Sequence, residues 1–262
     1  MNTLTYQQFS PHIGTITLSD PSSRNAMTED MAVEFAQLVN DLSNQTRTLR
    51  AIIVTGAGSA FSSGGNLEML EQKRQLSGEE NRLRMLSFYR SFLGLRSLGV
   101  PLIAAINGHA IGAGLCIACA CDIRIASLQA KLGVPFVRLG LYPGMGSTFL
   151  ISGIVGHAKA SELLLTGRII TGKEALEIGL VSEAVEPEEV LNRAIAIATE
   201  IASAGPSTIR HLIGTLRHPP STLEEALLQE AAAQAISYAS DEFAEGLLSA
   251  RERRAPLFTS QT

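Results

Sequence analysis

One short stretch, residues 107–122, limits what this chain can fold into more than any other part of the sequence. It joins the apolar run Val100–Ile106 to a run of small and apolar residues, with Gly112 and Gly114 at the junction. The apolar run is too short and too tightly bounded for a long helix, so it is typical of a buried strand. The glycines allow the backbone to turn closely into a helix. We therefore predict a strand, a glycine turn and a helix in succession.

This junction also predicts a site for negative charge. The first N–H groups of a helix have no partner within the helix, and the helix dipole adds partial positive charge at the same end. A negatively charged oxygen is favoured there. Both a phosphate and a reacting carbonyl fit this prediction.

Composition excludes several classes of protein. Among the 262 residues, 45% are hydrophobic, which supplies a sizeable core, and a net charge of −4 offers no basic face for nucleic acid. No apolar run reaches membrane-spanning length, and the first ten residues lack the features of a secretory signal. Three cysteines within residues 116–121 argue against a disulfide framework. We expect a cytoplasmic protein that binds neither nucleic acid nor membranes.

The first part of the chain has the pattern of a βαβ unit. His12–Leu18 alternates in the manner of a strand, and Ala51–Thr55 is a short apolar strand of the type that a covered sheet buries. Between them, Thr28 is placed to cap a helix whose apolar residues recur on one face as far as Leu42. Strand, helix and strand in this order predict two parallel strands.

A second glycine-rich loop, residues 56–66, directly follows the second of these strands. Gly56 and Gly58 begin a dinucleotide-binding pattern, but Phe61 stands at its third glycine position, so that motif is absent. A helix is predicted over residues 83–93, with Tyr89 among its apolar residues and several arginines on its solvated face.

The second half of the chain contains a third glycine turn and a false nucleotide motif. We expect a strand at Ile123–Ala126 and a turn over residues 139–147, after which Ser147 caps a helix. Residues 167–173 match most of a Walker A loop, but Glu174 replaces the metal-binding hydroxyl. We interpret Thr171 as the cap of a helix that Gly179 ends. From residue 187 the pattern is helical, which divides a mixed core (1–186) from a helical region (187–262) that acts as a lid or oligomer contact.

Several segments, taken in order, resemble the crotonase, or enoyl-CoA hydratase/isomerase, superfamily. They span nearly the whole chain, and the ordered set is far more specific than any one segment. The matching segments are Arg24–Met27, Ala60–Leu67, Pro101–Gly108, Gly112–Gly114, Cys121–Asp122, Leu139–Gly144, Leu165–Gly167, Glu245–Gly246 and Arg254.

The resemblance implies an α/β fold, namely a crotonase-like spiral of ββα turns with a helical C-terminal region. It implies a homotrimer or hexamer and a CoA thioester as substrate, with no cofactor beyond the CoA that the substrate carries. It also implies that two backbone N–H groups, carried over to Gly65 and Ala113, form an oxyanion hole for the thioester oxygen. The residues implied to bind substrate are Arg24, Ala26, Ser63, Gly64, Gly65, Asn66, Leu67, Gly112, Ala113 and Phe136.

The chain departs from the hydratases of this family at their two catalytic glutamates. By motif, the first falls at Cys116 and the second at Phe136. A general acid or base must exchange a proton at the operating pH, and phenylalanine cannot. The resemblance therefore leaves open an isomerase or decarboxylase that stabilises an enolate, and a catalytically silent acyl-CoA-binding subunit.

Four other side chains are candidates for proton transfer, each with a plainer interpretation. Cys116 is either a base or nucleophile or a small core residue, and Tyr142 either donates a proton or lines the acyl pocket. His109 and Glu68 lie near the glycine loops and are interpreted as structural or exposed residues. A metal site is not expected, because a helix spreads Cys119 and Cys121 about 200° apart.

Basic residues offer contacts for the CoA phosphates. Arg24 belongs to a matching motif, and we expect it to contact CoA. Arg251, Arg253 and Arg254 either do the same from a neighbouring subunit or form a solvated helix end.

Overall fold

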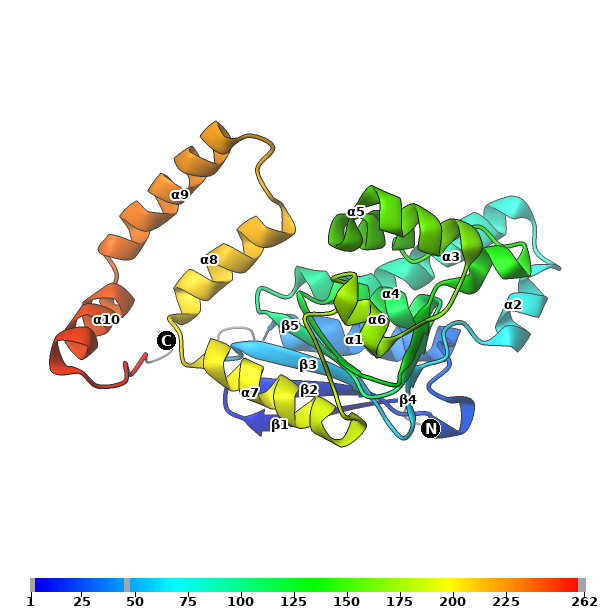
Figure 1. The fold of residues 1–262 in the computed structure, drawn as a ribbon, viewed down its shortest axis with the longest axis horizontal. Coiled ribbons are helices and arrows are strands. Elements are labelled where there is room, and N and C mark those ends of the chain that lie inside the picture. Colours follow the sequence, from blue (N-terminus) through cyan, green and yellow to red (C-terminus); the bar gives the residue numbers. More distant parts are fainter. Residues whose placement is uncertain (1–2, 45–47, 259–262) are drawn as a thin grey trace.

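The computed structural model describes residues 3–44 and 48–258 (Figure 1). The larger of its two sheets has six strands. Their order is β1-β2-β3-β5-β7-β10. β1 and β2 are antiparallel, and every other neighbouring pair is parallel. The bounds of the six strands are β1 (Leu4–Ser10), β2 (Ile13–Leu18), β3 (Ala51–Gly56), β5 (Leu102–Ile106), β7 (Ile123–Ser127) and β10 (Glu183–Val185).

A smaller sheet of four short strands, in the order β4-β6-β8-β9, accompanies the first. Each of β3, β5 and β7 is followed by one strand of this smaller sheet and then by a helical segment. The expected spiral of ββα turns is therefore confirmed. The bounds of the four strands are β4 (Ala60–Ser62), β6 (His109–Ile111), β8 (Lys131–Gly133) and β9 (Ile170–Thr171).

Ten α-helices occur in the described part of the chain, and most begin where the sequence supplies a capping side chain. The Thr28 hydroxyl accepts from the N–H of Met31 at 3.1 Å, as predicted. The bounds are α1 (Glu29–Ser43), α2 (Leu67–Lys73), α3 (Gly78–Leu93), α4 (Ala113–Ala120), α5 (Ser147–Thr166), α6 (Gly172–Glu177), α7 (Val190–Ala202), α8 (Pro206–Arg217), α9 (Leu223–Tyr238) and α10 (Asp241–Glu252).

Two predictions about helix ends in the second half had opposite outcomes. Thr171 caps α6, accepting from the N–H of Glu174 at 3.2 Å, and Gly179 follows its end with a φ of +74°. The expected Ser147 cap of α5 is wrong: Gly146 precedes the helix in a left-handed conformation, and Ser147 is its first residue. Only glycine enters that conformation freely, so Gly146 sets the start of α5.

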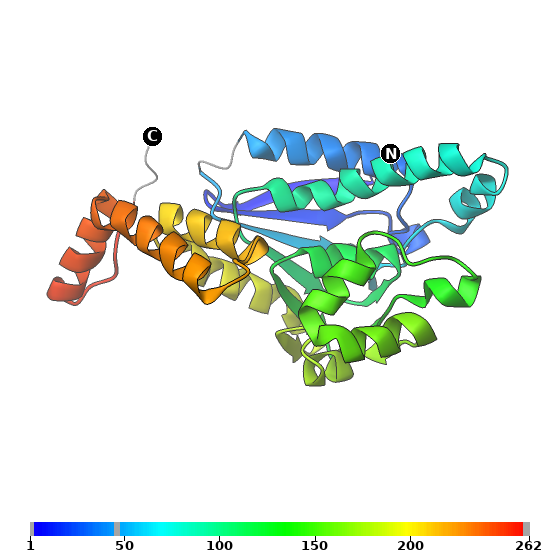
Figure 2. The ribbon, with the colours of Figure 1, turned by 90° about the horizontal axis from the view of Figure 1, so that it is seen from above.

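The central strands β3 and β5 of the larger sheet are buried on both faces. On one face, α1 and α3 lie side by side (Figure 2), and the rings of Phe35 and Phe92 meet at a centroid distance of 5.1 Å. On the other face, α7 packs through Val190, Ala194 and Ala198. Burial on both faces explains why β3 and β5 are continuous apolar runs, as the sequence predicted.

Helix α4 lies at the centre of the molecule. All eight of its residues are buried. A side chain at Gly114 would place its Cβ 2.7 Å from the carbonyl oxygen of Ser62, so only glycine allows α4 to approach β4 this closely.

From residue 190 to residue 252, the helical elements are α7 to α10. Helices α8 to α10 extend away from the sheets (Figure 1). A side-chain pair anchors α8, because Arg217 contacts Asp122 at 2.6 Å and donates to the carbonyl oxygens of Leu98 and Val100. The division of the chain at residues 186 and 187 into a core and a lid or oligomer contact stays a prediction.

Candidate active site

The two glycine loops meet in space. Gly64 has a φ of +88°, and a Cβ built on it would lie 2.5 Å from the carbonyl oxygen of Ile111 and 3.4 Å from the nitrogen of Ala113. Glycine is therefore required at this position both for its backbone conformation and for the close approach of the second loop. The loop after β4 and the start of α4 consequently form one site.

Each loop contributes a backbone N–H group without a partner. Met27 donates to the carbonyl oxygen of Gly64 at 2.7 Å and accepts from the N–H of Asn66 at 3.1 Å. Neither bond uses the N–H of Gly65, the residue between Gly64 and Asn66. Ala113 is the first residue of α4, which has no side-chain cap. Within residues 3–44 and 48–258, no group accepts from the N–H of Gly65 or Ala113.

Both of these residues line a cavity of about 800 Å³. This volume lies within the range of about 300–1,000 Å³ that is typical of small-molecule sites. The wall consists of α2, α3, the two glycine loops and the segment 135–145, and much of it is apolar. Its apolar side chains include Met69, Leu70, Met85, Phe88, Ile111, Phe136, Leu141 and Met145.

Charged side chains line the part of the cavity formed by α2. Lys73 contacts Glu29 at 2.8 Å, and Arg74 contacts Glu71 at 2.8 Å. Lys73, Arg74 and Glu71 all line the cavity. Exposed ion pairs such as Arg74–Glu71 contribute little stability, so the guanidinium of Arg74 is available to an anionic ligand.

Most of the residues that the sequence singled out for substrate binding line this cavity. They are Ser63, Gly64, Gly65, Leu67, Gly112, Ala113 and Phe136, together with Tyr142. Leu67 and Tyr142 are 73% and 82% exposed. An apolar side chain and a phenol thus stand in contact with solvent at the edge of the site.

Three other expected binding residues, Arg24, Ala26 and Asn66, are outside the set that lines the cavity. The Asn66 side chain caps α2, accepting from the N–H of Met69 at 2.9 Å. Ala26 is buried. The carbonyl oxygen of Arg24 accepts from the N–H of Ser63 at 2.9 Å, so its backbone supports the loop while its side chain is exposed.

Cys116 is enclosed in the protein rather than presented to the cavity. Its exposed fraction is 0%, and burial raises the pKa of its thiol well above the ordinary value. The thiol donates to the carbonyl oxygen of Gly144 at 3.8 Å. A thiol with a raised pKa holds little thiolate at neutral pH, so Cys116 is poorly suited to act as a base or nucleophile.

Two further candidates have structural surroundings. The Nδ1 atom of His109 accepts from the backbone N–H of Lys131 at 3.0 Å. Glu68 is an exposed residue in the first turn of α2, where a negative charge suits the helix dipole. At the other end of the chain, Arg254 contacts Glu245 and Glu252, both at 2.6 Å.

Sequence reasoning missed Tyr89 as a residue of the site. Its position on the apolar side of a helix was predicted, but no local signal says which cavity that helix faces. In the structure Tyr89 lines the cavity, and a Cβ on Gly144 would lie 2.4 Å from its hydroxyl oxygen. Burial raises the pKa of Tyr89 above 10.0.

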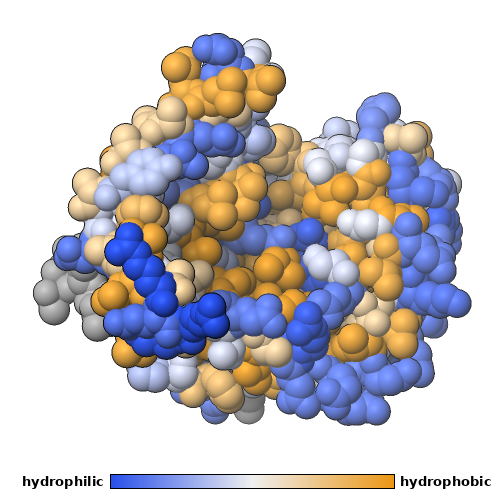
Figure 3. Space-filling model, turned by 60° about the vertical axis from the view of Figure 1, so that its left-hand side comes forward, coloured by the Kyte–Doolittle hydropathy of each residue, from blue (hydrophilic) through white to orange (hydrophobic). Residues whose placement is uncertain are grey.

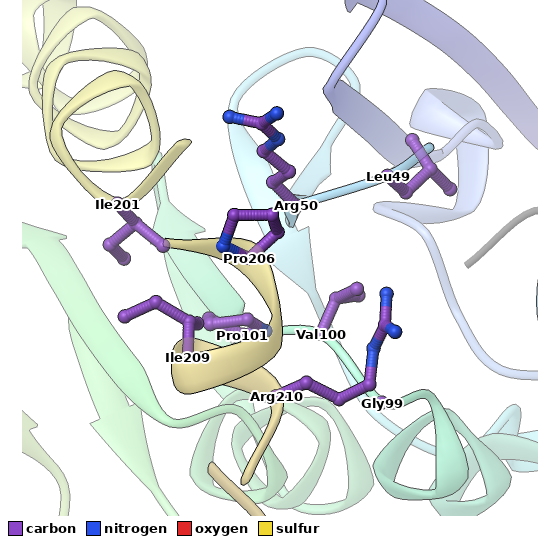
Figure 4. Close-up of a pocket in the computed structure, with 9 residues that line it drawn as sticks. All are labelled: Leu49, Arg50, Gly99, Val100, Pro101, Ile201, Pro206, Ile209 and Arg210. Atoms are coloured by element: carbon purple, nitrogen blue, oxygen red, sulfur yellow. The ribbon is translucent and has the colours of Figure 1, made fainter. Parts of the chain in front are cut away.

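A second cavity, at the junction of α7 and α8, is of a different kind. Figure 4 shows Arg50, Pro206 and Arg210 around it, and its volume is about 10 Å³, room for about one water molecule. Arg50 donates to the carbonyl oxygen of Ala202 at 2.7 Å. This cavity is a packing gap at a helix junction.

The described residues contain no group of three or more histidine, cysteine, aspartate or glutamate side chains placed to hold a metal ion. None of the helices described here combines the length and the apolarity needed to cross a membrane.

Two sheets wound in ββα turns, with paired backbone donors at an apolar cavity, define an α/β protein suited to bind a small molecule through a carbonyl or anionic oxygen. The chain belongs to the enoyl-CoA hydratase/isomerase family, whose sequence model matches residues 8–261. This finding confirms the resemblance that the glycine-loop motifs indicated.

Known relatives agree with this assignment. A short-chain-enoyl-CoA hydratase of Clostridium acetobutylicum is 37% identical over 199 residues, which cover 76% of this chain and 75% of that protein. The crystal structure of an enoyl-CoA hydratase from Bacillus anthracis matches with a TM-score of 0.92 and 30% identity, covering 99% of this chain and 100% of that one. An enoyl-CoA hydratase from Polaromonas sp. JS666 matches with a TM-score of 0.91 and 25% identity, covering 98% and 99%.

Proposed function

We propose that this protein is an enzyme that binds an acyl-CoA thioester and stabilises its enolate through the N–H groups of Gly65 and Ala113. The observation that carries this proposal is the pairing of two unpartnered backbone donors, one on each glycine loop, in the wall of one cavity. The cations Lys73 and Arg74 on the same wall suit the phosphates of CoA.

Backbone donors are suited to this chemistry because they favour the charged oxygen over the neutral carbonyl. An enolate places most of its negative charge on the oxygen, and the dipole of α4 adds to the attraction at Ala113. The fixed donors need no reorganisation as the charge develops. In other enzymes, the loss of one such donor raises the barrier by about 3 kcal/mol.

We further propose that ordinary hydration is not the principal reaction. Hydratases of this family use two glutamates, and Cys116 and Phe136 stand at those positions. Neither supplies a carboxylate, and the thiol is fully buried. Decarboxylation or double-bond isomerisation fits better, and decarboxylation asks least of the side chains, because loss of CO2 creates the enolate without a base.

A second candidate is a catalytically silent acyl-CoA-binding subunit. The same two replacements, Cys116 and Phe136, favour it. It predicts saturable binding of acyl-CoA with no conversion of any thioester, whereas the enzyme predicts both binding and conversion.

The discriminating experiment offers the purified protein a panel of enoyl-, hydroxyacyl- and malonyl-type CoA thioesters and identifies products by mass spectrometry. Binding is measured separately by calorimetry. We expect binding across the panel, conversion of at least one member, and hydration of crotonyl-CoA far below about 10 per second. Absence of acyl-CoA binding contradicts the proposal, and binding without conversion selects the silent subunit.

The variant Ala113→Pro tests the oxyanion role directly. Proline suits the first position of a helix and has no N–H, so it removes the donor while keeping α4. We expect turnover to fall by about 100- to 1,000-fold. Gly78→Pro is the matched control, because Gly78 is likewise the first residue of its helix, α3. The preceding residue, Ser77, has φ −63° and ψ 158°, an extended conformation that a following proline tolerates. Equal turnover in the two variants would contradict a donor at Ala113.

We also propose that the protein assembles as a trimer or a hexamer. Helices α8 to α10 expose many large hydrophobic side chains. Figure 3 shows this side of the molecule, where hydrophobic patches lie among hydrophilic surface. Burial of such surface is the main driving force for association. Sedimentation should give three or six times 27.9 kDa. The exposed side chains are Leu212, Leu216, Leu223, Leu227, Leu228, Ile236, Tyr238, Phe243, Leu247 and Leu248.

The cytoplasmic setting stays a prediction, and it rests on the cysteines. Cys116, Cys119 and Cys121 are free thiols.

A further inference from the structure

Tyr89 occupies a place in the cavity wall that the neighbouring loop leaves open for it. The residue lies on α3 and is partly buried. A Cβ on Gly144 would lie 2.4 Å from the hydroxyl oxygen and 3.0 Å from the ring carbon that bears it. Any other residue at position 144 would therefore displace the phenol.

The hydrogen bonding of Tyr89 leaves its proton available. No residue within 3–44 and 48–258 accepts from this hydroxyl. A phenol has one O–H donor, so the proton of Tyr89 is free for a ligand in the cavity.

Tyr89 also lies close to the turn of α4 that follows the proposed oxyanion donor. Gly144 is close to both side chains: a Cβ built on it would lie 2.4 Å from the Tyr89 hydroxyl oxygen, and its carbonyl oxygen accepts from the thiol of Cys116, three residues after Ala113, at 3.8 Å. At 1.5 Å of rise per residue, that separation is about 4.5 Å along the helix axis. Cys116 stands where the family's hydratases carry their first glutamate, so the hydroxyl of Tyr89 is beside the place where that carboxylate would act.

The other lining side chains that exchange protons are less well placed. Lys73 and Arg74 are the cations assigned to the CoA phosphates, and each contacts a carboxylate, Glu29 for Lys73 and Glu71 for Arg74. Tyr142 is 82% exposed to solvent. Tyr89 is the lining group that combines partial burial with proximity to α4.

We propose that Tyr89 is the proton donor that quenches the enolate of a 2-carboxyacyl-CoA thioester after loss of CO2, an inference that rests on the proposed function. The bond between C2 and the carboxylate breaks and CO2 leaves. The electron pair of the broken bond forms the enolate. The Tyr89 O–H bond then breaks as a C2–H bond forms, and the thioester carbonyl is restored. The phenolate recovers a proton from water in the open cavity.

Burial supports donation over abstraction. It raises the pKa of Tyr89, so the residue holds its proton at neutral pH and serves as an acid. Because decarboxylation needs an acid for C2 and no base, this one side chain completes the reaction.

The test compares the full-length protein with Tyr89→Phe, using malonyl-CoA and its 2-methyl derivative in D2O. Tyr6→Phe is the matched control, because the Tyr6 hydroxyl is also buried and has no hydrogen-bond partner among the described residues, but lies on β1. We expect stereospecific deuteration at C2 of the 2-methyl product in the unaltered protein and in Tyr6→Phe. Tyr89→Phe should lose the stereospecificity and give a mixture of both configurations, with turnover lower by up to about 100-fold, while binding of acetyl-CoA changes by less than about threefold.

The outcomes separate the two proposals. If Tyr89→Phe keeps the turnover and stereospecificity of the unaltered protein, or if it turns over slowly but still stereospecifically, Tyr89 is not the donor and the proposed function stands. If the unaltered protein binds acyl-CoA and converts no thioester, the enzyme and the donor are both refuted. If it converts other thioesters but neither malonyl compound, only the decarboxylation and its donor are refuted.

Discussion

Gly64→Ala tests the contact on which the site depends. The alanine would hold a φ of +88°, which costs about 1–2 kcal/mol for an L-residue. Its Cβ would also lie 2.5 Å from the carbonyl oxygen of Ile111, almost 1 Å inside ordinary contact. Because that neighbour is backbone, relief requires the two glycine loops to separate.

The expected loss of stability follows from these two effects. Overpacking a tight contact costs about 1–3 kcal/mol, so we expect the free energy of unfolding to fall by about 3 kcal/mol. Gly179→Ala is the matched control, because it has a φ of +74° and no atom within 4 Å of the added Cβ. Strain without a clash should cost it about 1 kcal/mol. Chemical denaturation, followed by circular dichroism at one protein concentration, measures both.

Activity should respond more sharply than stability. A displacement of about 1 Å at a positioned group costs about 100-fold in rate, so conversion of acyl-CoA by Gly64→Ala should fall by that factor. Gly179→Ala should keep the original rate. The reasoning is refuted if Gly64→Ala loses no more stability than Gly179→Ala and converts substrate at the original rate.

Two further predictions concern stability. Arg217→Ala should lower the free energy of unfolding by about 3–5 kcal/mol, because it leaves the Asp122 carboxylate, only 14% exposed, without its ion-pair partner. Arg82→Ala, which breaks an exposed pair with Glu79, should lower it far less in the same denaturation assay. Equal losses in the two variants would contradict the argument. Stability should also decline above about pH 8.5, where unfolded thiols ionise, because burial raises the pKa of Cys119 to about 11 and the folded protein keeps the proton. Cys119→Ala should make the decline shallower, and an unchanged slope would count against this cause.

Local sequence signals predicted the secondary structure well where a side chain acts on its own backbone. Thr28 and Thr171 cap their helices because each hydroxyl reaches an N–H only three residues ahead. The prediction that Ser147 caps α5 was wrong because the preceding Gly146 takes the left-handed conformation, so that the helix begins one residue earlier, at Ser147. The start of α3 was missed because the capping box of Ser77 and Glu80 lies within a polar, charged segment that gives no periodic signal.

The site was only partly predictable. Gly64, Gly65, Gly112 and Ala113, which line the cavity, were predicted because they stand in the glycine-loop motifs that resemble those of the family. Tyr89 was not, because its role depends on α3 lying across the cavity from α4.

The sequence by itself determined the family, through the order of its glycine-loop motifs, and the helix caps Thr28 and Thr171. These are properties of residue identity and spacing. Only the tertiary structure decided that Cys116 is sealed from the cavity, that Asn66 caps a helix, and that the Tyr89 phenol stands beside α4. Burial and contact between distant segments depend on how the ββα turns stack, and no local pattern carries that information.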